Sequence, residues 1–307
     1  MAELLCEFAT RFPDLAANIL HRDRHKRRNF REETITDLLM AGLIGYEPFG
    51  IYVDFPADES KTGEDMDWEF VDPDEPNGRC YLRLHIQAKR AIRSTAKTKS
   101  NRYWYYRELD HAVPKGAKKG SQHEMLLRQA HALPGCVPLY AFYHPKQALN
   151  RRGSAGPAIE GVNLMFADQI PVNLTAKAWP RTDKKVATWR PHFLPLSTFL
   201  CFGTGPKVLG RMADRTVVFY LAPGAGAAPT PGAIADRLNE LRGGGTAARD
   251  ERPVATSQEI PQRTRAALEE RRARGRGART ERPAIELERP RVIFDAQRIR
   301  SDFLNED

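Results

Sequence analysis

The stretch from residue 59 to residue 89 constrains the fold most strongly, because it has the pattern of two strands joined by a turn. It reads E-S-K-T-G-E-D-M-D-W-E-F, then a segment rich in Pro, Asn and Gly, then Y-L-R-L-H-I-Q-A-K. Alternation in the second run places Gln87 and Lys89 on one face of a strand and apolar residues on the other. We therefore expect a lysine and an amide side by side on a half-buried strand, with carboxylates one hairpin away.

The length of the hairpin loop decides which side chains face each other. A loop of three residues, 76–78, would place Asp65 opposite Lys89, and a loop of five would place it opposite Gln87. A strict two-residue turn at the Asn-Gly pair would move Asp65 to the wrong face. If these side chains act together, the hairpin must have an odd-length loop or a bulge.

Patterns around the hairpin predict a mixed α/β fold. We expect a helix over 31–43, strands over 50–55, 65–71 and 80–89, a helix that begins at Ser121 with a capping box, and a strand over 137–143. Between 150 and 221 the pattern is weaker, with an apolar run at 193–202 and a strand at 216–221. The expected core therefore has the order helix, three strands, helix, strand.

The segment from 222 to 307 differs in composition from the rest of the chain. It contains 16 Arg against 14 Asp and Glu, no Lys and few aromatic residues. Such a segment buries too little apolar surface to offset the entropy of ordering, so we expect a largely disordered, Arg-rich tail with a helix near 260–273. The expected domains are a basic helical lead-in (1–28), a folded domain (29–221, core motifs 31–145) and this tail (222–307).

Charge and cysteine usage narrow the class of protein. The 307 residues carry a formal net charge of +9, of which only about +2 lies in the tail, and a basic body suits a polyanionic partner. The four cysteines show no metal-type spacing, so we expect reduced thiols in a cytoplasmic protein. We expect neither a signal peptide nor a membrane span. Nucleotide-binding glycine loops and the G-x-S-x-G elbow are absent from the sequence.

The order of elements, an acid that opens the second strand and Gln-x-Lys in the third strand resemble the core of the PD-(D/E)XK nuclease superfamily. The resemblance is greatest to the branch, including Mrr-type restriction endonucleases, in which Gln replaces the second acid. The segments R-E-E-T-I-T-D, T-G-E-D-M-D-W and I-Q-A-K-R are also similar to an uncharacterised bacterial domain family of that superfamily. The resemblance covers about residues 28–145 and implies a restriction-endonuclease-like αβββαβ core with a mixed central sheet.

This resemblance implies a metal site. It implies that Asp65 and Gln87 bind a divalent cation, Mg²⁺ or Mn²⁺, that Lys89 is the catalytic lysine, and that a glutamate of the first helix completes the metal shell. At about 100° per residue, Glu32 shares the inward face of that helix and Glu33 does not, so Glu32 is preferred and Glu33 is the alternative.

Several neighbouring residues could support this site. Asp67 is a further candidate ligand, and Thr36, His85 and Gln122 could flank the cation. We expect Asp67 to lie with Glu69 on the solvent face of their strand, with metal contact as its alternative. The alternatives are ordinary packing for His85, a surface position for Gln122 and an interaction with the helix macrodipole for Glu32.

A basic and aromatic run, K-R-A-I-R-S-T-A-K-T-K-S-N-R-Y-W-Y-Y, begins at Lys89. It predicts contacts with nucleic-acid phosphates from Arg90, Arg93, Lys97, Lys99 and Arg102. A solvated loop is the alternative.

Together these features predict metal-dependent hydrolysis of phosphodiester bonds in nucleic acid, with DNA as the expected substrate. The resemblance alone implies a role in bacterial restriction or anti-phage defence. No membrane partner is expected, and a homodimer would supply the two sites that double-strand cleavage needs. The alternative is a module of the same fold that binds nucleic acid or a protein partner without cutting. Gln87 keeps this alternative open, because it removes a negative charge from the metal site.

Overall fold

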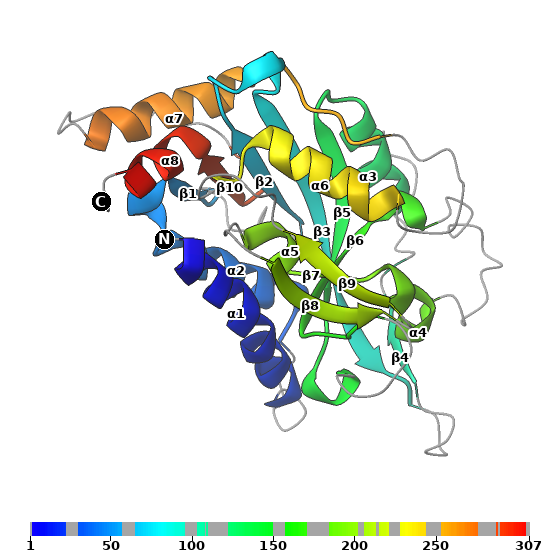
Figure 1. Cartoon of the computed structure of the whole chain (residues 1–307). Coiled ribbons are helices and arrows are strands. Elements are labelled where there is room, and N and C mark those ends of the chain that lie inside the picture. Colours follow the sequence, from blue (N-terminus) through cyan, green and yellow to red (C-terminus); the bar gives the residue numbers. More distant parts are fainter. Residues whose placement is uncertain are drawn as a thin grey trace, which may run out of the picture.

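A mixed eight-stranded sheet organises the protein (Figure 1). The computed structural model describes residues 2–22, 30–56, 65–95, 103–107, 109, 122–149, 157–170, 184–201, 206–212, 215–220, 228–243, 253–275, 287 and 289–304. The sheet contains β1 (Ile51–Asp54), β2 (Asp65–Val71), β3 (Tyr81–Arg93), β4 (Trp104–Tyr106), β5 (Cys136–Tyr143), β6 (Val162–Phe166), β7 (Leu194–Pro195) and β10 (Arg291–Asp295). Their order is β1-β10-β2-β3-β5-β6-β7, with β4 paired to β3. A separate hairpin is formed by β8 (Pro206–Met212) and β9 (Arg215–Tyr220).

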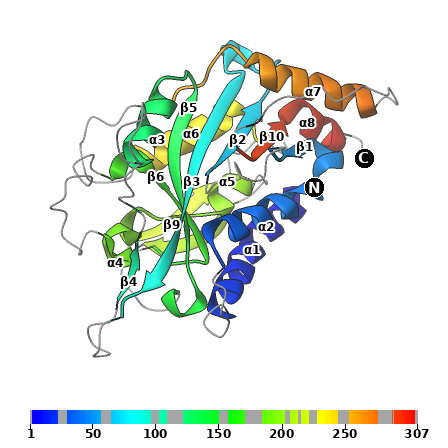
Figure 2. The same cartoon turned by 180° about the vertical axis from the view of Figure 1, so that it is seen from behind.

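Helices cover both faces of the sheet. They are α1 (Ala2–Arg22), α2 (Glu32–Ile44), α3 (Gln122–His131), α4 (Val186–Trp189), α5 (Ser197–Leu200), α6 (Pro231–Gly243), α7 (Gln262–Gly275) and α8 (Ala296–Leu304). The largest apolar core lies between one face of the sheet and α1, α2, α6 and α8. Smaller cores lie on the other face, one with α3 and one with α7. Figure 1 looks onto the face that α6 crosses, and Figure 2 shows the sheet from behind.

The β2–β3 hairpin has one of the two registers that place Asp65 on the same face as Gln87 and Lys89. Asp65 lies opposite Gln87, and the strands end with Val71 opposite Tyr81, so the connection, 72–80, has an odd number of residues. In the loop Asn77 and Gly78 have φ values of 67° and 68°, a backbone region in which Gly is unstrained and Asn is tolerated. The expectation of an odd-length connection is therefore confirmed.

The predicted mixed α/β order is also confirmed. The elements α2, β1, β2, β3, α3 and β5 occur in the expected order, each close to its predicted bounds, and the unpredicted β4 lies between β3 and α3. The third strand is longer than predicted, because it continues past Lys89 to Arg93 and pairs there with β4.

The prediction of a disordered tail is wrong for the described residues of 222–307. β10 lies inside the sheet, antiparallel to β1 and parallel to β2. Phe294 of β10 stacks on Phe70 of β2 with ring centroids 4.6 Å apart. The helix expected near 260–273 is confirmed as α7. Average composition concealed the short apolar run R-V-I-F-D, whose parallel partner precedes it by more than 200 residues.

The expectation of four reduced thiols is wrong for one pair. Cys6 of α1 forms a disulfide with Cys201, which follows α5, while Cys80 and Cys136 are free and partly buried. Packing of α1 against α5 brings the two cysteines together, a contact that a sequence separation of 195 cannot reveal. Every helix in the described residues is too short or too polar to cross a membrane.

A buried histidine next to β5 makes stability depend on pH. His144 is 0% exposed, and its ring lies 2.6 Å from the Tyr106 hydroxyl (Nε2) and 2.8 Å from the Glu160 carbonyl (Nδ1). A neutral ring satisfies both, because Nδ1–H donates to the carbonyl while Nε2 accepts from the hydroxyl. Burial lowers the pKa of His144 from 6.5 to about 4.

We expect the free energy of unfolding to fall as the pH decreases from about 6.5 towards 4. In this window the unfolded chain binds a proton at His144 that the folded chain excludes, so stability rises with pH by up to about 1.4 kcal/mol per unit. Urea unfolding at several pH values measures the slope. His144→Gln should flatten it, and an equally steep slope in this variant would contradict the assignment.

Candidate functional site

Alternate residues of β2 and β3 line one face of the sheet with polar side chains. Buried or nearly buried on this face are Asp67, Glu69, Arg83, His85, Gln87 and Lys89. The expectation that Asp67 and Glu69 lie on a solvent face is therefore wrong. The cause is α7, whose Thr264 donates a hydrogen bond of 2.8 Å to Glu69.

Lys89 is fixed at the far end of this row. Its side chain is 1% exposed, and Nζ donates to Oε1 of Gln122, the first residue of α3, over 3.0 Å. The neighbouring His123 holds α3 against the sheet, with its ring 3.1 Å from both the Tyr140 hydroxyl and the Ile170 carbonyl. The structure thus brings Gln122 to Lys89, although a glutamine at such a position is more often a surface residue.

Gln87 lies two residues before Lys89 on the same face and is 3% exposed. Its strand neighbours are Asp65 on β2 and Tyr140 on β5. Among the described residues no group donates a hydrogen bond to its buried Oε1. A buried carbonyl oxygen without a donor is costly, so this atom is suited to a bound cation or water. The backbone of Asp65 is described, but its side chain lies outside the described residues.

Glu32 reaches the same end of β3 from the other layer. Its helix, α2, packs on the apolar face of the sheet, and its Oε1 accepts a hydrogen bond of 3.1 Å from the Arg90 amide. Glu33 has a buried Oε2 without a hydrogen-bond partner among the described residues. The Thr36 hydroxyl instead lies 2.9 Å from the Tyr143 hydroxyl, so Thr36 ties α2 to β5.

Asp67 belongs to an ion-pair network and not to the candidate cation position. Arg83 forms a close ion pair with its Oδ2, and His85 Nδ1 lies 2.7 Å from its Oδ1. With Nδ1 protonated, His85 Nε2 can accept from Arg289 Nη1, which lies 2.6 Å away. Burial alone would raise the pKa of Asp67, but the His85 hydrogen bond and the Arg83 charge together lower it well below its usual range. His85 is therefore part of this network as well.

The expected nucleic-acid contacts are only partly described. Arg93 is exposed at the end of β3. Arg90 is partly buried and its guanidinium donates to the Phe30 carbonyl. Lys97, Lys99 and Arg102 lie outside the described residues.

A metal site in this protein would therefore need ligands of more than one kind, an amide oxygen as well as a carboxylate. Among the side chains that the structure describes, no three His, Cys, Asp or Glu residues form a group that could hold a metal ion. A cation on the polar face of β3 would need the Gln87 amide oxygen and the Asp65 carboxylate, whereas Glu32 approaches the strand from the other face of the sheet, where it accepts from the Arg90 amide. The sequence did not predict the roles of His123 and Arg289. His123 contacts the Ile170 carbonyl, which is far away along the chain, and Arg289 comes from the segment that was expected to be a disordered tail.

Fold and site together define an α/β protein with a buried lysine–amide cluster on the polar face of a central strand. The chain belongs to the DUF6615 family, a family of unknown function, whose model matches residues 5–300. The match includes most of the segment that composition alone separated as a tail. Comparisons with curated proteins and with solved structures find no match.

We expect Asp67→Ala to lower the free energy of unfolding by about 3 kcal/mol or more, because it leaves Arg83 buried without its ion-pair partner. Denaturant unfolding measures this loss. The matched control is Glu7→Ala, which removes an exposed ion pair with Arg11 and should cost less than about 1 kcal/mol. A cost for Asp67→Ala as small as the control's would show that the network is not structural.

Proposed function

We propose that this protein is a metal-dependent nuclease that hydrolyses phosphodiester bonds in nucleic acid, with DNA as the expected substrate. The observation that carries the proposal is the register of Asp65 opposite Gln87, with buried Lys89 two residues further along the same face. The order α2-β1-β2-β3-α3-β5, with β4 between β3 and α3, supports it, because the superfamily that the sequence resembles is expected to have helix, three strands, helix and strand in this order.

The residues on the polar face of β3 suit a hard divalent cation. Asp65 and Gln87 would provide oxygen ligands, whereas Glu32 approaches the strand from the other face of the sheet. The unpartnered Oε1 of Gln87 fits this role, because carboxylate and amide oxygens are ligands that Mg²⁺ and Mn²⁺ accept. When bound, such a cation supplies charge for the phosphate oxygens and a water of lowered pKa.

Lys89 would stabilise the negative charge that develops on the phosphate and orient the attacking water. Its ammonium group is buried, and electrostatic interactions are stronger there than in water. Gln122 holds the group in place through a neutral amide oxygen. This contact fixes the position of the ammonium group and limits its movement.

A second candidate function is nucleic-acid binding without cleavage. Gln87 favours it, since a neutral ligand in place of an acid weakens the attraction for Mg²⁺. A role in bacterial restriction or anti-phage defence rests on analogy with the superfamily alone. Cleavage of both DNA strands would require two such sites, which a homodimer would provide.

Plasmid DNA incubated with the protein and Mg²⁺ or Mn²⁺ tests the proposal. We expect nicking or linearisation that stops when a chelator removes the metal. Asp65→Asn and Lys89→Met should each reduce the rate by roughly 100-fold or more, because each removes charge that stabilises the transition state. Arg11→Gln, at an exposed position of α1, is the matched control and should cut like the wild type.

Circular dichroism must first show that each variant is folded. Equal cleavage by the wild type and both variants would reject the assigned residues. Salt-sensitive DNA binding without any cleavage would favour the second function.

A further inference from the structure

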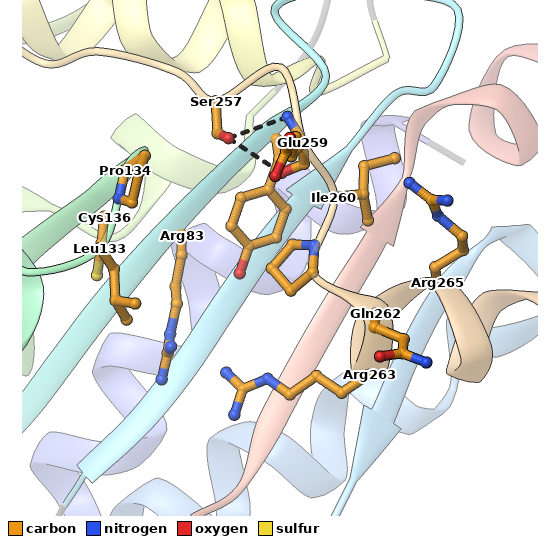
Figure 3. A pocket seen from close by; sticks show the side chains of 12 residues that line it. Arg83, Leu133, Pro134, Cys136, Ser257, Glu259, Ile260, Gln262, Arg263 and Arg265 are labelled. Atoms are coloured by element: carbon orange, nitrogen blue, oxygen red, sulfur yellow. Dashed lines mark hydrogen bonds between the residues drawn. The ribbon is translucent and has the colours of Figure 1, made fainter.

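A pocket of about 760 Å³ opens at the start of β3, between the start of β5 and the start of α7 (Figure 3). Tyr81 and Arg83 form its β3 side, and Arg263 reaches it from α7. Arg83 and Lys89 are six residues apart on the strand, which corresponds to about 20 Å. The pocket is therefore separate from the proposed nuclease site, and its volume lies in the range of small-molecule sites.

Two buried hydrogen-bond donors in this pocket have no acceptor in the part of the chain that the structure describes. Tyr81 is 3% exposed, and its hydroxyl has no hydrogen-bond partner among the described residues. The Nε of Arg83 is likewise buried and unpartnered in the described part of the chain. Each such donor costs about 1–3 kcal/mol when it is left unsatisfied. An anionic ligand, which is rich in acceptor oxygens, would satisfy both.

The charged groups around the pocket are mostly cationic. Figure 3 shows the guanidinium groups of Arg83 and Arg263 directed towards the same side of the pocket, one from the sheet and one from α7. Both also line a small adjoining cavity, together with Arg289 and Arg291. Asp67 and Glu69 partly offset this charge through ion pairs with Arg83 and Arg263, respectively.

Two further features of the pocket favour an anion. Arg263 is 44% exposed although it pairs with Glu69, so solvent and ligands can reach it. The first turn of α7, a helix of 14 residues, adds the partial positive charge of a helix N-terminus. Glu259 is the acidic residue in the lining, and its side chain is exposed.

The remaining wall is apolar. Leu133 and Pro134 line one side, and Ile260 and Pro261 line another (Figure 3). Inorganic phosphate would make no use of this wall, whereas a flat ring attached to a phosphate would cover it. The nearby Cys136 thiol is no nucleophile, because burial raises its pKa to about 12. The pocket is therefore suited to binding.

We infer that this pocket binds a nucleotide, with the phosphate between Tyr81, Arg83 and Arg263 and the base against the apolar wall. A free mononucleotide and the terminal nucleotide of a nucleic-acid strand share this chemistry. The inference goes beyond the proposed nuclease activity and does not depend on it, because neither Asp65, Gln87 nor Lys89 lines the pocket.

Calorimetric titration of the full chain with adenosine 5′-monophosphate, in the presence of a chelator, tests the inference. Tyr81→Phe and Arg263→Gln should each weaken binding by about tenfold or more, the usual effect of losing a hydrogen bond to a charged group. Arg11→Gln removes the same charge far from the pocket and should bind like the wild type. Tyr81→Phe should leave the unliganded protein at least as stable, because the lost hydroxyl has no described partner.

Parallel titrations distinguish the sources of the ligand. Binding of adenosine monophosphate supports a free nucleotide, and binding of a short single-stranded oligonucleotide alone supports a strand end. The chelator removes the metal that cleavage would need, so a failure of the nuclease proposal leaves this result intact. The inference is overturned if neither probe binds, if inorganic phosphate binds as tightly as the nucleotide, or if the two pocket variants bind unchanged.

Discussion

The antiparallel register of β2 with β3 is the constraint on which the rest of this structure depends. It places Asp65 opposite Gln87 and gives every second residue of both strands to the same face. A slip by one residue would turn Trp68 and Leu84 towards the polar layer and carry the charges into the main apolar core. Because that core buries one face of both strands completely, the register is strongly specified, and with it the neighbours of Lys89.

Such a register puts charged groups inside the protein, and buried charges must be paired. At Asp67 and Glu69 the pairing is complete, through Arg83 and His85 for the former and Thr264 and α7 for the latter. The C-terminal segment is thus the cover that this face of the sheet requires. Its inclusion in the family match, 5–300, agrees with that structural role.

Pairing is incomplete at two places along β3. Among the described residues, no group donates to the buried oxygen of Gln87 at the middle of the strand, and no group accepts from the Tyr81 hydroxyl or the Arg83 Nε near its start. An unsatisfied acceptor suits a cation and unsatisfied donors suit an anion. Departures from polar satisfaction in an otherwise consistent fold occur mainly at functional sites.

Local patterns predicted the parts of the fold that depend on local physics. The alternation of β3, the odd-length connection that a shared site requires and the helix that follows Ser121 were all predicted. Predictions failed where a partner comes from far along the chain. The insertion of β10 beside β2, the Cys6–Cys201 bond and the burial of Glu69 under α7 all depend on long-range packing that composition averages conceal.

The central claim is that oxygen atoms of Asp65 and Gln87 share one divalent cation beside Lys89. A crystal soaked in Mn²⁺ and measured at a wavelength where manganese scatters anomalously tests it most directly. The account predicts an anomalous peak about 2.0–2.6 Å from Gln87 Oε1 and from an Asp65 carboxylate oxygen. Side chains that point apart, with no peak between them at saturating Mn²⁺, would contradict it.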